Sequence, residues 1–311
     1  MIKKIIEKIE NQVNVENNQY QENLKIVKKD FIEYCMPGSV NNWTHPELPP
    51  AQASFVTLCN LIKFKRILDF GSGLSSYCLR KNLNYKTDIT SIDNSFVWLS
   101  RLFDFCEKNN INTKNFFWLY DHKILNLEKL PLEFLKSKEK TSIKNPGNDY
   151  EGKEKELISE ICFEPEIYWV FTDTSPLNSP NVPSSLDNNA TKSLINLKKG
   201  SKNILLNTGN NFETLNSLGK FDFIHFDYGG MRTRESYLKA AFDMLDRTNF
   251  SIIYVDDLHR DTIIYDNKKF IDIVDDFLIN EKKGIKINCQ NALTDSTGGF
   301  GAFYIFEGDN N

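Results

Sequence analysis

The sequence predicts an α/β protein whose core is a doubly wound, mostly parallel sheet. Short apolar runs alternate with amphipathic segments of helical period from residue 66 to 108, and the same alternation returns from 221 to 280. A glycine turn, Gly71-Ser72-Gly73, directly follows one apolar run and precedes a helix-compatible segment, Ser75–Asn82. A strand, a tight turn and a helix start in this order can hold a nucleotide-like ligand at the carboxyl end of a parallel strand.

The composition is that of an ordinary soluble globular protein. The chain has 311 residues, 40% hydrophobic and 26% charged, which suffices for one large domain or two small ones. The formal net charge of −4 implies no broad basic surface, so nucleic acid is not an expected partner. The six cysteines form no C-x-x-C pair, which argues against a zinc or disulfide framework and favours a reducing, cytoplasmic location.

The N-terminal residues 1–36 are expected to be helical and amphipathic, with Ile2, Ile5, Ile6 and Ile9 on one face. The first ten residues are too charged for a secretory signal, and no apolar run approaches the roughly 18 residues that span a bilayer. No membrane partner is therefore expected. The apolar face indicates a helix packed on the domain or on a second subunit, as in a homodimer, and a membrane-surface helix is the alternative.

A polar and aromatic loop, 41–50, and a helix, 51–64, lead into the first strand. The loop could cover a ligand or could be an ordinary connector. We accordingly divide the chain into an N-terminal helical cap, residues 1–60, and a main domain, residues 61–311.

Strands and helices are expected to alternate through the main domain. After the first strand and helix at 66–82, the expected elements are a strand at 88–92, a helix at 96–108, a third strand at either 116–120 or 203–207, a strand at 221–226, a helix at 233–245, a strand at 251–255, a helix at 270–280 and strands at 285–288 and 300–306. Residues of uneven, partly charged composition separate the two candidate third strands. We treat 122–200 as an insertion that forms a lid or an interface.

The glycine turn differs from a dinucleotide fingerprint. The pattern G-x-G-x-x-G would require a third glycine where Ser76 stands, and an apolar residue usually occupies the position of Asp69. The second strand-like run ends in Asp93, about twenty residues past the turn, where a carboxylate can accept hydrogen bonds from a ribose diol. With Asp69-Phe70-Gly71-Ser72-Gly73 and Asp93, residues 51–306 outside the insertion resemble the class I S-adenosylmethionine-dependent methyltransferases.

This resemblance implies a Rossmann-like, seven-stranded sheet of the methyltransferase type. It also implies that Asp69 orients the amino group of S-adenosylmethionine, directly or through water. Gly71 and Gly73 would let the methionine part of the cofactor lie against the backbone.

The rest of the cofactor would contact polar residues on the neighbouring strand ends. Asp93, with the adjacent Asn94, would hold the ribose. In such enzymes an acidic residue after the third strand often contacts the adenine. Asn210 stands there in this sequence, and its amide can both donate and accept a hydrogen bond.

Acidic residues also end two strands of the second half, namely Asp227 and the pair Asp256-Asp257. Carboxyl ends of adjacent strands meet at one edge of an open sheet, so three carboxylates could converge there and bind Mg²⁺ or another divalent cation. This is similar to the catechol-type metal-dependent O-methyltransferases, in which the metal binds the acceptor hydroxyl and lowers its pKa. The resemblance therefore implies methylation of a small-molecule hydroxyl, with Asp227, Asp256 and Asp257 as metal ligands.

The sequence departs from that pattern at the catalytic base. Catechol-type enzymes carry a lysine shortly after the first metal-binding Asp, and none follows Asp227 here. His259 is then the candidate base, with Asp227 as the second catalytic residue. His225 is interpreted as a satisfied core residue, and Arg232 and Arg234 either hold an anionic substrate or merely begin a solvated helix.

Two other functions compete with this one. A metal-free methyltransferase could act on nitrogen or on a protein side chain, with the acidic strand ends serving as caps or substrate contacts. A methyltransferase-like protein could also bind ligands without catalysis, although the intact Asp69, Gly71, Gly73 and Asp93 argue against this.

Overall fold

The structure is a computed structural model of the chain. It describes residues 2–13, 16–34, 50–93, 96–120, 123–126, 213–228, 234–248, 250–256, 258, 264–265, 268–288 and 301–308. Several predicted features lie outside the described residues: the loop 41–49, most of the insertion and the candidate strand 203–207. Four predicted site residues also lie outside them, namely Asn94, Asn210, Asp257 and His259.

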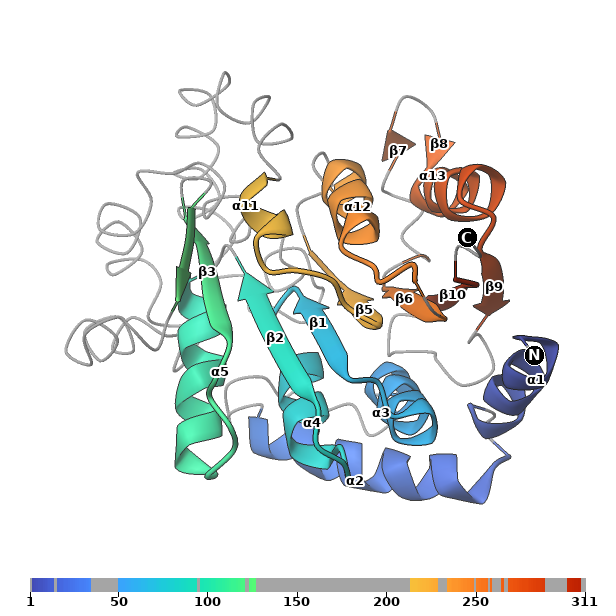
Figure 1. The fold of residues 1–311 in the computed structure, drawn as a ribbon. Helices are drawn as coiled ribbons and strands as arrows, with labels where there is room; N and C mark the ends of the chain where they lie inside the picture. The colour runs from blue at the N-terminus through green and yellow to red at the C-terminus, as the bar shows by residue number, and fades with distance from the viewer. Residues whose placement is uncertain are drawn as a thin grey trace.

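A single large sheet of eight strands forms the centre of the described structure, in the order β4-β3-β2-β1-β5-β6-β10-β9 (Figure 1). Its strands are β1 Arg66–Phe70, β2 Asp88–Asp93, β3 Phe116–Tyr120, β4 Lys123–Asn126, β5 Phe223–Phe226, β6 Ser251–Val255, β9 Ile285–Asn288 and β10 Ala302–Phe306. The five central strands are parallel to one another, namely β3, β2, β1, β5 and β6. Strand β10 is antiparallel to β6 and β9, and β4 is antiparallel to β3. The prediction of a doubly wound, mostly parallel sheet is confirmed.

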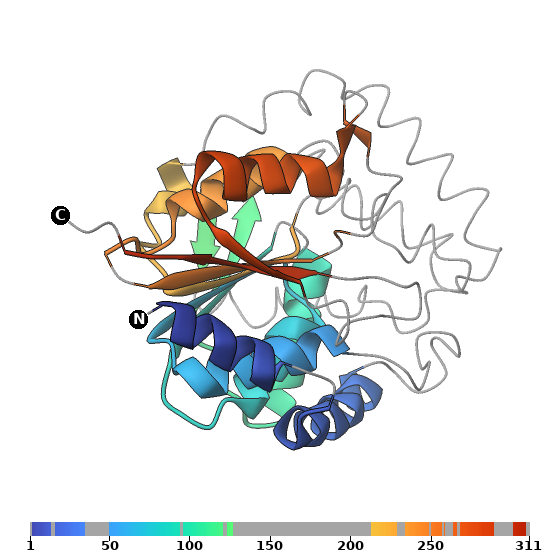
Figure 2. The ribbon, with the colours of Figure 1, turned by 90° about the vertical axis from the view of Figure 1, so that its right-hand side faces the viewer.

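Helices cover both faces of this sheet (Figure 2). One face carries α1 Ile2–Gln12, α2 Asn18–Tyr34, α3 Pro50–Ile62, α4 Leu74–Asn82 and α5 Phe96–Lys108. The other carries α11 Glu213–Asn216, α12 Arg234–Asp243 and α13 Phe270–Asp275, which continues as a π-helix, Asp276–Glu281. A short hairpin of β7 Ile264–Tyr265 and β8 Lys268–Lys269 precedes α13. None of the described helices is long and apolar enough to cross a membrane.

Successive side chains of the central strands enter two different hydrophobic clusters. On β1, Ile67 packs with α3, whereas Leu68 packs with α12 and α13 on the opposite face. Both faces are covered, so these strands are apolar almost throughout rather than alternating with polar residues. The α3 side also buries Ile9 of α1, so the apolar face of this helix packs on the domain itself.

The structure refines several expected boundaries. The N-terminal helical segment consists of two helices, α1 and α2. The third strand of the sheet is Phe116–Tyr120. Strand β4, Lys123–Asn126, lies within the range assigned to the insertion and pairs with β3, so the sheet includes these four residues of that range.

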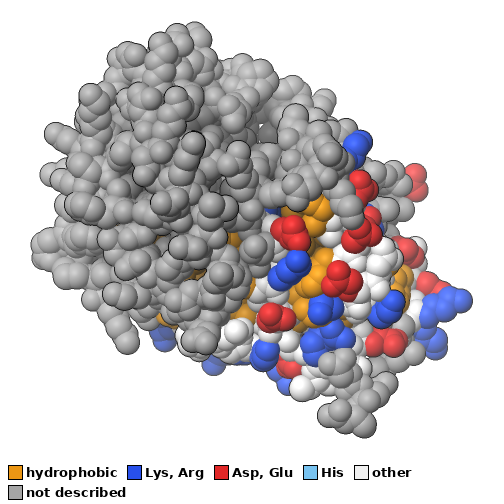
Figure 3. All heavy atoms as spheres, turned by 90° about the horizontal axis from the view of Figure 1, so that it is seen from above, with side chains coloured by type: hydrophobic (Ala, Val, Ile, Leu, Met, Phe, Trp, Pro, Cys, Tyr) orange, Lys and Arg blue, Asp and Glu red, His pale blue; other side chains and the backbone are white. Residues whose placement is uncertain are grey.

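The direction in which strands are added reverses at β1, with β2 on one side and β5 on the other. In an open α/β sheet the crevice at such a reversal, outside the carboxyl ends of the strands, is the usual ligand site. Seen from above the view of Figure 1, the part of the surface that the structure describes carries acidic and basic side chains interspersed with hydrophobic ones (Figure 3). The candidate site is therefore sought where β1, β2, β5 and β6 end.

Candidate cofactor and acceptor site

The turn after β1 is held against the end of β5. Gly71 has a φ of +110°, and its amide donates to the carbonyl of Ile92 at 3.0 Å. A β-carbon at this position would lie 2.0 Å from the carbonyl oxygen of Asp227, which is far inside contact distance. Both the backbone angle and the close approach require glycine here. Glycine is thus needed at position 71 because of contact with the protein's own backbone rather than with a ligand. The same contact places Asp227 beside the turn.

Gly73 has a different environment. It immediately precedes α4, and a β-carbon built on it would meet no atom of the described residues within 4 Å. Its amide donates to the hydroxyl of Ser76 at 3.0 Å. Open space beside a half-buried backbone at a helix N-terminus is what close approach of a ligand needs. The described residues thus fit the expected cofactor at this point.

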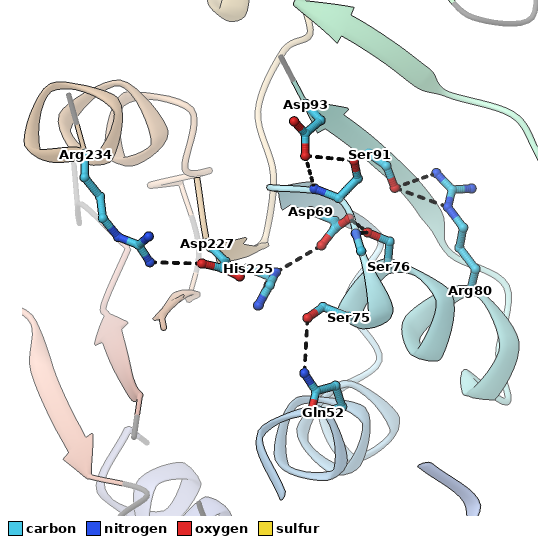
Figure 4. Close-up of polar contacts among 12 residues, drawn as sticks. Gln52, Asp69, Ser75, Ser76, Arg80, Ser91, Asp93, His225, Asp227 and Arg234 are labelled. Atoms are coloured by element: carbon cyan, nitrogen blue, oxygen red, sulfur yellow. Dashed lines mark hydrogen bonds and ion pairs between the residues drawn. The ribbon is translucent and has the colours of Figure 1, made fainter. Parts of the chain in front are cut away.

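Asp93 joins the end of β2 to the same turn. Its Oδ2 accepts from the backbone N–H of Ser72 at 2.7 Å and from the Ser72 hydroxyl at 2.9 Å (Figure 4). Charge-assisted hydrogen bonds of this kind are stronger than neutral ones, so they hold the turn and the strand end together. Asp93 is therefore beside the turn, as the ribose assignment requires, and its contact with a ribose stays a prediction.

Asp69, on β1 just before the glycine turn, is fully buried. The hydroxyl of Ser76 donates to its Oδ2, and Nδ1 of His225 lies 3.0 Å from its Oδ1 (Figure 4). His225 is the directly paired residue on β5, which explains the short distance. Asp69 therefore supports the glycine turn from within, through Ser76, and its predicted contact with the cofactor stays a prediction.

The predicted burial of His225 in the core is confirmed, but only one of its two ring nitrogens is satisfied among the described residues. Its ring lies almost parallel to that of Tyr254, with centroids 5.7 Å apart and planes 14° apart, and Phe55 packs against it at 5.0 Å. Burial disfavours the charged imidazole, but the hydrogen bond with Asp69 and its charge outweigh burial, so the pKa of His225 is raised. Among the described residues its Nε2 has no hydrogen-bond partner.

Sequence reasoning missed Ser76 as a structural residue and used it only as a departure from a glycine pattern. Ser76 accepts from Gly73 and donates to Asp69, so it links the turn to the buried pair. A serine in the first turn of a helix, three residues after the turn glycine, is the signal that could have revealed it.

At the other side of the turn, Arg234 pairs with Asp227. Nη2 of Arg234, the first residue of α12, lies 3.1 Å from Oδ1 of Asp227 and 3.2 Å from the carbonyl oxygen of Asp256 (Figure 4). The side chain of Arg234 is only 6% exposed, whereas that of Asp227 is 40% exposed. Of the two alternatives for Arg234, the solvated helix start is wrong, because the folded chain buries this side chain.

The described part of the predicted metal site does not fit a divalent cation. One carboxylate oxygen of Asp227 is already bonded to a guanidinium, and Asp256 contributes its backbone carbonyl to the same group. The described residues contain no cluster of three or more His, Cys, Asp or Glu that could hold a metal. The roles of Asp257 and His259 stay predictions.

Comparison with known proteins gives distant structural similarity alone. No family model and no curated protein sequence matches the chain. An O-methyltransferase from Bacillus cereus in complex with SAH is 12% identical, with a TM-score of 0.42 over 92% of this chain and 90% of that one. The O-methyltransferase TomG from Streptomyces achromogenes, involved in tomaymycin synthesis and solved with SAM, is 11% identical, with a TM-score of 0.40 over the same shares. Cofactor-bound Rv0187 from MTB is 10% identical, with a TM-score of 0.41 over 95% and 93%.

Because the similarity to these proteins is low, the fold is assigned from the chain's own topology and residues. Strands β3-β2-β1-β5-β6-β10-β9 form a seven-stranded sheet with only β10 reversed, and β4 adds an eighth strand at one edge. The glycine turn lies at the reversal of strand order, with Asp93 beside it. The chain has the Rossmann-like fold of the class I S-adenosylmethionine-dependent methyltransferases.

Proposed function

We propose that this protein is an S-adenosylmethionine-dependent methyltransferase that methylates a hydroxyl oxygen of a small molecule. The observation that carries the proposal is the open backbone at Gly73, at the N-terminus of α4, with the carboxylate of Asp93 fixed beside the same turn. The methionine part of the cofactor would lie along the turn, and its ribose would lie toward Asp93. The acceptor would enter where Asp227 is exposed, next to the turn.

The proposed reaction is an in-line displacement. The bond between the sulfonium sulfur and its methyl group breaks while a bond between that methyl group and the acceptor oxygen forms. S-Adenosylhomocysteine leaves as a neutral thioether, and the hydroxyl proton passes to a base. Positioning two reactants in line provides a large part of the acceleration in such a step, and the rigid connection of turn, β2 and β5 supports it.

Binding of S-adenosylhomocysteine, measured by calorimetric titration, tests the cofactor assignment. We expect saturable binding to one site, weakened at least about tenfold by Asp93→Ala because the ribose would lose a charged acceptor. Asp246→Ala is the matched control, since Asp246 is a carboxylate bonded to Thr248 at a loop in the other half of the sheet. Absence of binding to the wild type would remove the enzyme proposal.

The acceptor class is tested by transfer of a labelled methyl group from S-adenosylmethionine to pooled phenols and alcohols, amines and unfolded protein. We expect label on the hydroxyl compounds. Label on amines or protein alone would replace O-methylation by the nitrogen or protein alternative. Cofactor binding with no transfer to any class would favour the non-catalytic alternative.

A further inference from the structure

The guanidinium of Arg234 occupies a defined position between the ends of β5 and β6. Its Nη2 bonds Oδ1 of Asp227 at 3.1 Å and the carbonyl oxygen of Asp256 at 3.2 Å, so one group joins both strand ends. The central carbon of the guanidinium lies 5.6 Å from the ring centre of Phe226 and 5.3 Å from that of Phe270. Contacts of this kind attract a cation to aromatic faces. Arg234 is therefore a fixed positive charge in the wall of the site.

The pair is asymmetric in exposure. Arg234 is almost fully buried, while Asp227 remains 40% exposed. The carboxylate of Asp227, rather than the guanidinium of Arg234, is therefore the group of this pair that solvent reaches. A buried cation that bonds one oxygen of an exposed carboxylate limits the orientations of the other oxygen.

Asp227 also adjoins the cofactor turn. Its amide donates to the carbonyl of Phe70 at 2.9 Å, and its own carbonyl oxygen lies against Gly71. These backbone contacts fix the carboxylate relative to the turn that would hold the methyl donor. One residue thus borders both the cofactor turn and the exposed acceptor side.

We propose that Arg234 is the resident cation of the acceptor site and positions Asp227, which binds the acceptor hydroxyl and takes its proton without a divalent metal. This inference rests on the proposed methyltransferase function. In the step, the oxygen–methyl bond forms and the sulfonium–methyl bond breaks. The resulting protonated ether is a far stronger acid than a carboxylic acid, so its proton passes to Asp227.

This order of events removes the need for a metal. A metal in such enzymes lowers the pKa of the hydroxyl before methyl transfer. When the proton leaves after the bond has formed, a carboxylate is basic enough to accept it. A divalent cation at Asp227 would also be repelled by the adjacent guanidinium.

The first experiment asks whether the site binds a metal. Mn²⁺ is titrated into the full-length wild type, with and without S-adenosylhomocysteine, and bound ion is measured by electron paramagnetic resonance. We expect no bound Mn²⁺ with a dissociation constant below about 1 mM. Stoichiometric Mn²⁺ binding that Asp227→Asn abolishes would overturn the inference. Failure of S-adenosylhomocysteine to bind would instead count against the proposed function, and the Mn²⁺ result could still be read.

The second experiment asks whether Arg234 acts through its charge and shape. We expect Arg234→Ala to lower methyl transfer to the hydroxyl compounds by about tenfold to a hundredfold, with unchanged affinity for S-adenosylhomocysteine. Added guanidinium at millimolar concentration should restore part of the rate, and ammonium should not. Arg247→Ala is the matched control, because Arg247 also lies 5.3 Å from two phenylalanine rings but outside the site. Wild-type transfer rates in Arg234→Ala, or rates in the wild type abolished by chelation, would overturn the positioning role.

Discussion

The carbonyl oxygen of Asp227 lies so close to Gly71 that a β-carbon there would be only 2.0 Å away. The glycine turn after β1 and the acidic end of β5 are 156 residues apart in the chain, yet they are in direct contact. Under the proposed function, binding of the cofactor and orientation of the acceptor would therefore be coupled through backbone rather than through flexible side chains. The two turn glycines can be separated experimentally because their surroundings differ.

Gly71→Ala is expected to destabilise the fold. The new methyl group would collide with the backbone of Asp227, and the φ of +110° is strained for alanine. Together these effects should lower the free energy of unfolding by about 3 kcal/mol or more. Denaturant unfolding would measure it, and a variant as stable as the wild type would show that the turn and β5 are not in contact.

Gly73→Ala is expected to leave stability nearly unchanged and to weaken cofactor binding. Among the described residues a β-carbon at this position meets no atom within 4 Å, so the free energy of unfolding should change by no more than about 0.5 kcal/mol. The methyl group would occupy the space proposed for the cofactor, and affinity for S-adenosylhomocysteine should fall at least about tenfold. Unchanged affinity in calorimetric titration would place the cofactor elsewhere.

Ser76→Ala is expected to weaken the support of the turn. It removes the hydroxyl that donates to buried Asp69 and accepts from Gly73, which should cost about 1–3 kcal/mol of unfolding free energy. Ser75→Ala is the control on the same helix, because the Ser75 hydroxyl has a long, 3.5 Å contact with Gln52. Equal losses in the two variants would mean that the link to Asp69 contributes nothing specific.

The pair of His225 and Asp69 should make stability depend on pH. The pKa of His225 is raised in the folded protein despite burial, through Asp69 and the charges of Asp227 and Asp256. The contribution of His225 to stability is therefore fully present below its pKa in the unfolded chain, about 6.5, and is lost as pH rises through its higher pKa in the folded protein. Imidazole NMR should show a midpoint above about 6.5 for His225.

The same dependence should appear in unfolding measurements. The free energy of unfolding of the wild type should exceed that of His225→Gln by an amount that shrinks as pH increases from 6 toward 9. This is roughly the range in which a histidine with a raised pKa titrates. An advantage that stays constant or grows with pH would contradict the ion pair, and so would a titration midpoint below the ordinary value.

Much of the fold was predictable because its signals are local. The strand 66–70, the turn and the helix that follows are adjacent in the chain, and the apolar runs at 221–226 and 251–255 are as expected for parallel strands buried on both faces. The same holds for the placement of Asp93 at the end of β2. Strand β4 was not predicted, since an edge strand of four residues has too short a pattern to distinguish it from the insertion beside it.

Pairings between side chains far apart in the chain could not be predicted from the sequence. His225 was correctly interpreted as a core residue, but its pairing with Asp69 depends on the register of β1 against β5. Arg234 was left between two alternatives because an arginine at a helix start has no local signature of burial. Its contact with Asp227 and its position near Phe226 and Phe270 arise when α12 and α13 pack on one face of the sheet.

The sequence by itself determined the class of sheet, the glycine turn and the acidic strand ends, because these depend on periodicity and on residues close in the chain. Only the tertiary structure decided which groups these residues contact. It placed Asp227 against Gly71, directed Asp69 to Ser76 and His225, and set a buried guanidinium beside the predicted metal ligand. Such contacts follow from strand register and helix packing, which join residues far apart in the chain.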